Sequence, residues 1–220
     1  DTNTTGCENV AVGRDTMFAG TTACRSVAVG YRALKSVTTA ANNVGVGYHA
    51  LCTNTTGTKN VAVGVGALDA NTTASNNVAV GFDAMTTTTT GCRNVGVGES
   101  TLRSNSTGDA NVAIGAFSMD LNTTADNNTA VGFSALCTNT TGEENVAFGS
   151  NAMLDNTTGS RNVAVGRRAL QENTTAEGNA AIGNSALQNN TTGTQNVAVG
   201  ALALDANTTA AQNTAVGVCA

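Results

Sequence analysis

The chain has 220 residues and a formal net charge of −5, with 11% charged and 3% aromatic side chains. Nucleic-acid binding calls for a basic patch, so this weakly acidic composition argues against a nucleic-acid partner. No apolar run reaches the about 18 residues that indicate a membrane span, so no membrane insertion is expected.

The first predicted element is a short strand in the sequence motif Asn-Val-Ala-Val-Gly, which begins at Asn9 and recurs along the chain. Its glycine falls at Gly13 and then at every seventeenth position to Gly217, in thirteen copies without insertion or deletion. Loops tolerate changes of length at little cost, so this strict spacing indicates that each repeat is in register with its neighbours. The β-branched valines and the alternation of large and small residues favour a strand.

The large residues of each strand, such as Val163 and Val165, are expected to face the core, with the residue between them on the opposite side. This middle position holds only Ala or Gly in all thirteen copies, for example Ala11 and Gly45. Small residues allow close approach of another backbone. We therefore interpret the Ala/Gly column as a contact face for partner chains.

Two variable residues follow the glycine. The fourth residue after the glycine is Leu or Met, and this column, meaning the same position in successive repeats, holds all four methionines. These side chains are expected to fill the inside of each repeat. Together with the last apolar residue of each strand they form the predicted core: Val12, Val29, Leu34, Val46, Leu51, Val63, Leu68, Val80, Met85, Val97, Leu102, Ile114, Met119, Val131, Leu136, Phe148, Met153, Val165, Leu170, Ile182, Leu187, Val199 and Leu204.

The next predicted element is a turn with the sequence Asn-Thr-Thr in most copies, followed by Gly or Ala. The second threonine is present in all thirteen copies, from Thr5 to Thr209. Stacked Asn and Thr side chains can hydrogen-bond from one repeat to the next, and Gly and Asn permit corners with positive φ. The variable columns hold nearly all the charges and are expected to be exposed corners.

These elements predict an all-β fold, a parallel β-solenoid (β-roll) of thirteen 17-residue coils. The coils would stack at about 4.8 Å, the spacing of strands in a sheet. Known helical repeats are roughly twice this length, and the Gly and Thr content disfavours a helix. We expect one continuous domain over residues 1–220, and interpret a chain that begins at Asp1 as a fragment of a longer fibrous protein.

Self-association is the expected partner interaction. Few large apolar side chains are available to each coil, so burial of a further face against copies of the same chain would add stability. A slender single-chain solenoid is the alternative.

The motif Asn-Val-Ala-Val-Gly-x-x-Ala-Leu, followed by Asn-Thr-Thr-Gly, resembles the repeats of bacteriophage and viral tail-fibre shafts. It is also similar to the shorter repeats in the β-roll heads of trimeric autotransporter adhesins. The resemblance covers the whole sequence and implies a parallel homotrimer, an extracellular or virion-surface location, and attachment to a host-surface glycan or receptor. The chaperone domain that often follows a fibre shaft, and the neck and stalk of an adhesin, are missing from this sequence, so both families stay open.

Candidate sites for chemistry are few. Cys7 and Cys24 share a column in adjacent coils, where a spacing of about 4.8 Å would permit a disulfide. No zinc-type Cys or His spacing is present, so no metal is expected. The stretch Gly45–Ala50 matches a dinucleotide-binding fingerprint without the strand–loop–helix context, so no cofactor is expected. His49, the only histidine, lies in a variable corner, and no organised catalytic partners are apparent.

The resulting functional prediction is a non-enzymatic structural or adhesive fibre segment that spaces or presents a receptor-binding surface. The variable corners are expected to carry any ligand contact. Their aromatic members are the candidate surface contacts: Tyr31, Tyr48, Phe82, Phe117 and Phe133. The alternative is an ice-binding solenoid with a stacked threonine face, although adjacent threonines on a strand point to opposite sides and leave only one exposed rank.

Overall fold

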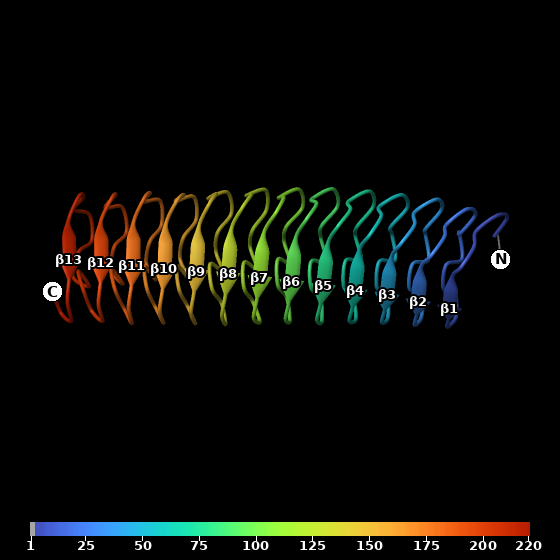
Figure 1. Cartoon of the computed structure of the whole chain (residues 1–220), viewed down its shortest axis with the longest axis horizontal. Coiled ribbons are helices and arrows are strands. Elements are labelled where there is room, and N and C mark those ends of the chain that lie inside the picture. Colours follow the sequence, from blue (N-terminus) through green and yellow to red (C-terminus); the bar gives the residue numbers. More distant parts are fainter. Residues whose placement is uncertain (1–2) are drawn as a thin grey trace. The chain divides into compact units, whose positions relative to one another are not determined.

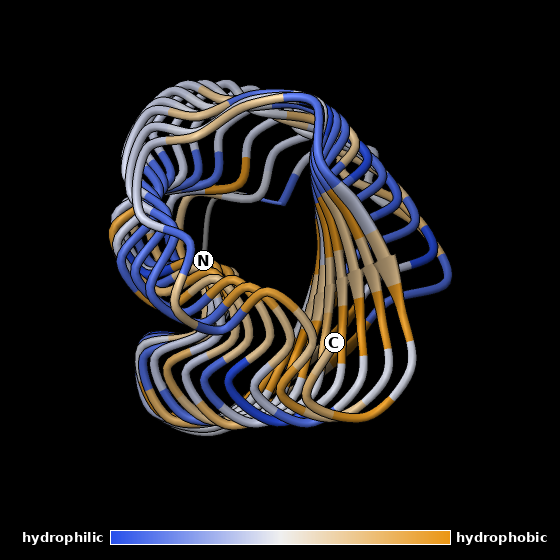
Figure 2. Ribbon diagram, turned by 90° about the vertical axis from the view of Figure 1, so that its left-hand side faces the viewer, coloured by the Kyte–Doolittle hydropathy of each residue, from blue (hydrophilic) through white to orange (hydrophobic). Residues whose placement is uncertain are grey.

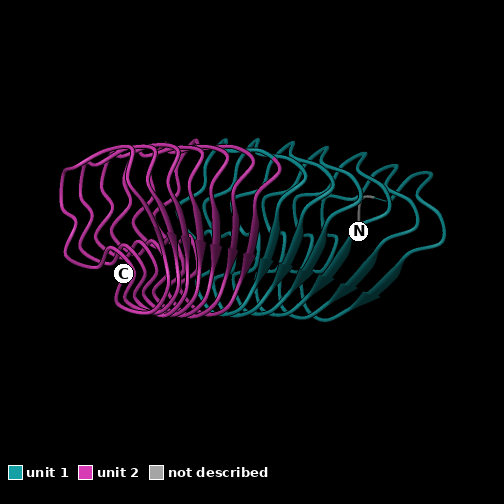
Figure 3. Cartoon of the chain, turned by 60° about the vertical axis from the view of Figure 1, so that its left-hand side comes forward, with its two compact units in different colours: residues 1–109 teal, residues 110–220 magenta. Residues whose placement is uncertain are grey.

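The structure is a computed structural model that describes residues 3–220. The chain forms two compact units, Asp1–Asp109 and Ala110–Ala220 (Figure 3). Residues 3–220 form thirteen strands of three residues, joined by turns and bends. Within this described range, the structure contains no helix with the length and apolar character needed to cross a membrane.

In the described part of the first unit, six strands follow one another in parallel, and each residue pairs with the residue seventeen positions later, as Val10 does with Val27. Figure 1 labels these strands. They are β1 (Val10–Val12), β2 (Val27–Val29), β3 (Val44–Val46), β4 (Val61–Val63), β5 (Val78–Val80) and β6 (Val95–Val97).

The second unit repeats this arrangement with seven parallel strands in residues 110–220, for example with Val112 paired to Thr129. The predicted all-β parallel solenoid of 17-residue coils is therefore confirmed in each unit. The strands are β7 (Val112–Ile114), β8 (Thr129–Val131), β9 (Val146–Phe148), β10 (Val163–Val165), β11 (Ala180–Ile182), β12 (Val197–Val199) and β13 (Thr214–Val216).

The Leu/Met column forms the core, as predicted. In the outermost predicted coil, Leu204 is half-buried. The other predicted members of the column are completely buried: Leu34, Leu51, Leu68, Met85, Leu102, Met119, Leu136, Met153, Leu170 and Leu187.

The predicted orientation of the strands is wrong. The middle Ala or Gly faces the core, and the flanking residues face outward, where Val12 is 57% exposed and Phe148 56%. Figure 2 shows the strands with orange valines on either side of a paler middle residue. The strand residues wrongly assigned to the core are Val12, Val29, Val46, Val63, Val80, Val97, Ile114, Val131, Phe148, Val165, Ile182 and Val199.

The Leu/Met side chain of the preceding coil explains why the middle residue must be small. A Cβ added to Gly45 would lie 3.3 Å from Cγ of Leu34, and one added to Gly96 would lie 3.0 Å from Cγ of Met85. An alanine methyl fills this space, whereas a larger side chain would overpack it. The Ala/Gly column is thus an internal packing surface, and its interpretation as a contact face for partner chains is wrong.

Buried asparagines link the coils, as predicted. In one column, Oδ1 of Asn145 accepts a hydrogen bond from the backbone N–H of Asn162 at 3.0 Å. In a second column, Nδ2 of Asn156 donates to Oδ1 of Asn139 at 2.8 Å. Buried polar groups are tolerated when their hydrogen-bonding capacity is met, as it is for the side chains of Asn145 and Asn156.

The corners of each coil are built from residues with left-handed backbone conformation. One coil of the second unit has Glu144 at φ 58°, Asn151 at φ 57° and the buried Met153 at φ 52°. This conformation costs an L-residue roughly 1–2 kcal/mol. Stacking must offset that cost three times per coil, so an isolated coil is not expected to keep this shape.

Candidate functional site

The outward face of the strands carries a repeated set of apolar side chains in each unit. Val10, Val12 and Val63 are among its exposed members in the first unit. In the second unit, both outward residues are exposed in β9 and β10 (Val146, Phe148, Val163 and Val165), and one of the two is exposed in β11 and β12 (Ile182 and Val197). Contiguous exposed apolar surface on a protein marks an interaction site when it extends beyond isolated residues. We call this two-rank surface the valine face.

Threonine forms a different exposed rank after the buried asparagine. The first threonine of each pair is committed to the stack, since Oγ1 of Thr140 donates to the carbonyl oxygen of Thr157 at 3.0 Å. The second threonine is exposed in successive coils, as at Thr141, Thr158 and Thr175. The expectation of a single exposed threonine rank is therefore confirmed.

The predicted aromatic contacts lie in the corners, as one stacked pair, one edge-on pair and one separate position. Tyr31 and Tyr48 stack with ring centroids 5.4 Å apart, and Phe117 meets Phe133 edge-on at 5.9 Å. Tyr48, Phe82 and Phe133 are more than half exposed, whereas Tyr31 and Phe117 are half-buried. Each unit thus has one pair of neighbouring aromatic rings at its corners, stacked in the first unit and edge-on in the second.

The predicted cysteine pair is brought together. The Sγ atoms of Cys7 and Cys24 lie 2.7 Å apart, and both residues are free thiols. The hydrogen bond with Cys24 raises the pKa of the Cys7 thiol above its usual range. The disulfide stays a prediction, which the geometry makes feasible without a large backbone movement.

A histidine, a cysteine and an aspartate from two neighbouring coils of the first unit lie close together. His49 and Cys52 lie in the corner after β3, and Asp69 lies in the corresponding corner after β4. Their potential ligand atoms all lie within 4.8 Å of one another, and Nδ1 of His49 is 3.9 Å from Oδ1 of Asp69. We call these three residues the His-Cys-Asp cluster.

Desolvation dominates the electrostatics of this cluster. Burial raises the pKa of the Cys52 thiol, and the Asp69 charge raises it further. Burial also raises the pKa of Asp69, against the lowering influence of His49. Nε2 of His49 and Oδ1 of Asp69 are buried and have no hydrogen-bond partner among the described residues. Charged forms of these groups therefore lack part of the compensation that buried polar atoms normally receive.

Sequence reasoning missed this cluster because it treated His49 as an isolated corner residue. The signal lies in two spacings, three residues from His49 to Cys52 and seventeen from Cys52 to Asp69. In a solenoid, the second spacing brings the two side chains together as neighbours in one column.

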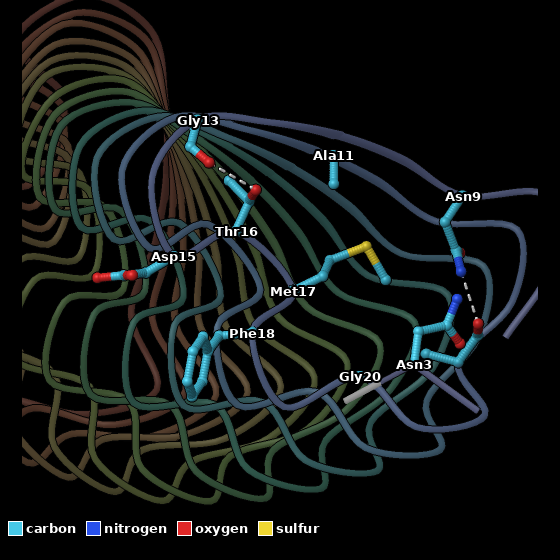
Figure 4. A pocket seen from close by; sticks show the side chains of 10 residues that line it. Asn3, Asn9, Ala11, Gly13, Asp15, Thr16, Met17, Phe18 and Gly20 are labelled. Carbon is cyan, nitrogen blue, oxygen red and sulfur yellow. Dashed lines mark hydrogen bonds between the residues drawn. The ribbon is translucent and has the colours of Figure 1, made fainter. Parts of the chain in front are cut away.

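A pocket opens on the first coil, lined by residues that include Ala11, Met17 and Gly20 (Figure 4). Asn9, at its edge, donates from Nδ2 to the carbonyl oxygen of Ala23 at 2.7 Å. Ala11 and Met17 belong to the two columns that pack against each other inside the following coils. The side chains of Asn3, Asn9 and Thr16 in this lining are already hydrogen-bonded to the backbone, so they are not an organised set of free polar groups typical of a ligand site.

The dinucleotide fingerprint is not realised, because Gly45 lies inside β3 and the following residues form turns without a helix. No protein-family model matches the chain, and a search of curated proteins finds no match either. Functional inference therefore starts from the surfaces described above.

Proposed function

We propose that the chain is a structural and adhesive segment of a fibre, which spaces or presents a receptor-binding surface without catalysis. The observation that carries this proposal is the valine face, which repeats in the same register in successive coils. An extracellular or virion-surface fibre, either a tail-fibre shaft or an adhesin head, is the setting that the repeat resembles.

Association through the valine face would form a parallel homotrimer. Copies related by rotational symmetry present the same repeating surface to one another, so each coil would meet an equivalent coil of its partner. Burial of an exposed apolar side chain contributes about 25 cal/mol per Å² removed from water. The gain accumulates with each coil, which suits a long repetitive interface.

The aromatic corners support the adhesive part of the proposal. Tyr48 and Phe133 are both exposed, and each belongs to a pair of neighbouring rings. Flat aromatic rings with polar neighbours suit stacking against the apolar face of a sugar ring. The proposed ligand is therefore a host-surface glycan that contacts the corners and leaves the valine face free for assembly.

Sedimentation equilibrium at micromolar concentration tests the assembly. We expect a trimer for the parent chain and a monomer for the variant Val146→Thr/Val163→Thr/Val197→Thr. Threonine is nearly isosteric with valine and already occupies this column at Thr129 and Thr214, so the variant should fold. A monomeric parent chain would refute the proposed assembly.

The matched control replaces an exposed residue away from the valine face. Thr158→Val makes the reverse change, a hydroxyl to a methyl group, on the threonine rank, and should leave the trimer intact. If the control dissociates as much as the valine-face variant, the interface assignment is wrong. Binding to a glycan array, compared between the parent and Tyr48→Ala, tests the adhesive surface.

Ice binding is a second candidate function, favoured by the exposed threonine rank. Successive hydroxyls in such a rank lie about 4.8 Å apart, the spacing of stacked strands. Against it, the neighbouring threonines donate their hydroxyls to the stack, so the rank is single. Thermal hysteresis measurement separates the candidates, because clear activity would contradict a fibre-only function and its absence would remove the ice-binding alternative.

A further inference from the structure

We propose that His49, Cys52 and Asp69 form a site for one Zn²⁺ ion, which links the coil of β3 to the coil of β4. The site is separate from the valine face and does not depend on the proposed fibre function. Imidazole nitrogen, thiolate sulfur and carboxylate oxygen are the three donor types that zinc binds in proteins.

The geometry of the cluster is close to that of a zinc site. Tetrahedral zinc with bonds of about 2.0–2.3 Å places its ligand atoms roughly 3.3–3.8 Å apart. Nδ1 of His49 and Oδ1 of Asp69 are already 3.9 Å apart, and the donor atoms of all three residues lie within 4.8 Å. Side-chain rotations that close these separations by roughly 1 Å would complete the arrangement.

The unsatisfied Oδ1 atom of Asp69 is an independent indication of a ligand. It is buried without a hydrogen-bond partner among the described residues, and it faces Nδ1 of His49, the other proposed donor. A native protein usually satisfies such atoms with protein, water or an ion. A cation would also supply the positive charge needed by a buried thiolate beside a carboxylate.

Stacking holds the imidazole in place. The ring of His49 lies against that of Tyr48 at 4.3 Å, with an angle of 8° between the planes, and Tyr31 stacks on the same imidazole at 5.8 Å. A ligand whose ring plane is fixed before the metal arrives loses little conformational freedom on binding.

Gly66 leaves room beside the cluster. Every other repeat has a side chain in its column, and the preceding member is His49 itself. A Cβ added to Gly66 would overlap Oδ1 of Asp83, so the Asp83 carboxylate leans across the space that a side chain would fill. The Asp83 charge also acts on Asp69. Asp83 lies outside the three-residue cluster, so a water molecule would supply the fourth zinc ligand.

Isothermal titration with ZnCl₂ tests the site in the full chain with Cys7→Ser and Cys24→Ser, which removes the other pair of adjacent thiols. One ion should bind per chain, and Cys52→Ser should weaken binding by at least about tenfold, as the loss of even an outer-shell partner does. Titration with Co²⁺ should give a thiolate-to-metal charge-transfer band that Cys52→Ser abolishes. Far-ultraviolet circular dichroism establishes that each variant keeps the solenoid.

Cys137 provides a matched control, because it occupies the same column as Cys52 with Ser134 in place of the histidine and Leu154 in place of the aspartate. Cys137→Ser should leave zinc affinity and the cobalt band unchanged, whereas Asp69→Asn should weaken binding. Absence of binding to the parent overturns the proposal, as does equal binding by Cys52→Ser. An equal loss with Cys137→Ser also overturns it.

Discussion

Asn145 joins its coil to the next through a fully buried amide. Its Nδ2 donates to the carbonyl oxygen of Gly159 at 2.8 Å, and its Oδ1 accepts from the backbone N–H of Asn162 at 3.0 Å and from Nδ2 of Asn162 at 3.2 Å. Asn145→Ala removes all three hydrogen bonds. The carbonyl of Gly159 keeps a bond from Asn156, but the buried N–H of Asn162 loses its acceptor.

The magnitude follows from what each group loses. A buried N–H without an acceptor costs about 1–3 kcal/mol, and each of the other two lost hydrogen bonds costs about 0.5–1.5 kcal/mol. We therefore expect Asn145→Ala to lower the free energy of unfolding by about 2–6 kcal/mol. Asn145→Ser should cost about 1–3 kcal/mol, since a hydroxyl can still accept from the N–H of Asn162.

Position 26 supports this distinction, because Ser26 stands in the asparagine column and its Oγ accepts from the backbone N–H of Asn43 at 3.2 Å. Urea unfolding followed by circular dichroism measures the stabilities, and hydrogen exchange at the Asn162 amide measures the local effect. Thr175 is exposed and does not have a positive φ, so Thr175→Ala provides the control variant. If Asn145→Ala is no more destabilising than this control, or equals Asn145→Ser, the ladder does not contribute as argued.

Three further outcomes are expected. Gly149→Ala should lower the free energy of unfolding by at least about 1–3 kcal/mol in urea titrations, because φ is 137° and the new Cβ would lie 2.6 Å from a carbonyl oxygen of the next coil. Gly178→Asn should be nearly neutral, because φ is 68°, which Asn tolerates, and the new Cβ would make only an ordinary contact of 3.7 Å with Cγ of Gln195. Ala147→Val should overpack the core and cost about 1–3 kcal/mol by the same measurement, and an unchanged urea midpoint would contradict the inward orientation of this column. Cys7 and Cys24 should form a disulfide under oxidation, which mass spectrometry would detect as the loss of two hydrogens. The reaction should be faster as pH rises, because the raised pKa of Cys7 keeps its thiol protonated near neutrality. The absence of a disulfide at any pH would refute this prediction.

The period and the nature of the coil could be predicted from the sequence, because the strict 17-residue spacing requires neighbouring repeats to match residue for residue. The column of Leu34 and Leu51 was also predictable, since its large apolar side chains recur at one position in each coil. Hydrogen-bonded asparagine ladders follow from the same registration, as Asn145 and Asn162 illustrate.

The inward face of the strand could not be assigned from alternation, which only places Val163 and Ala164 on opposite sides. The larger residue was expected inside, but Leu or Met from the preceding coil already fills that space. The restriction to Ala or Gly in every copy was the available signal, because a confined interior limits size more strictly than an exposed face. Val, Ile, Phe and Thr all occur at outward positions of the strands.

The His-Cys-Asp cluster could not be found by local motifs, because its members come from two coils. His49 and Cys52 are close in sequence, whereas Asp69 reaches them only through stacking. To find the cluster, one must first know the 17-residue register of the solenoid, and then ask which metal-binding side chains that register places in neighbouring coils.

The direction of the hydrogen bonds between coils bears on how each unit would respond to tension. Backbone bonds such as that from the N–H of Val163 to the carbonyl oxygen of Asn179, 2.8 Å long, connect successive coils along the stacking direction. A force applied along that direction would peel one coil away before the next is strained. Each 17-residue coil would release a contour of about 56–61 Å, so a pulled unit should lengthen in equal steps and absorb work while its remaining coils stay folded.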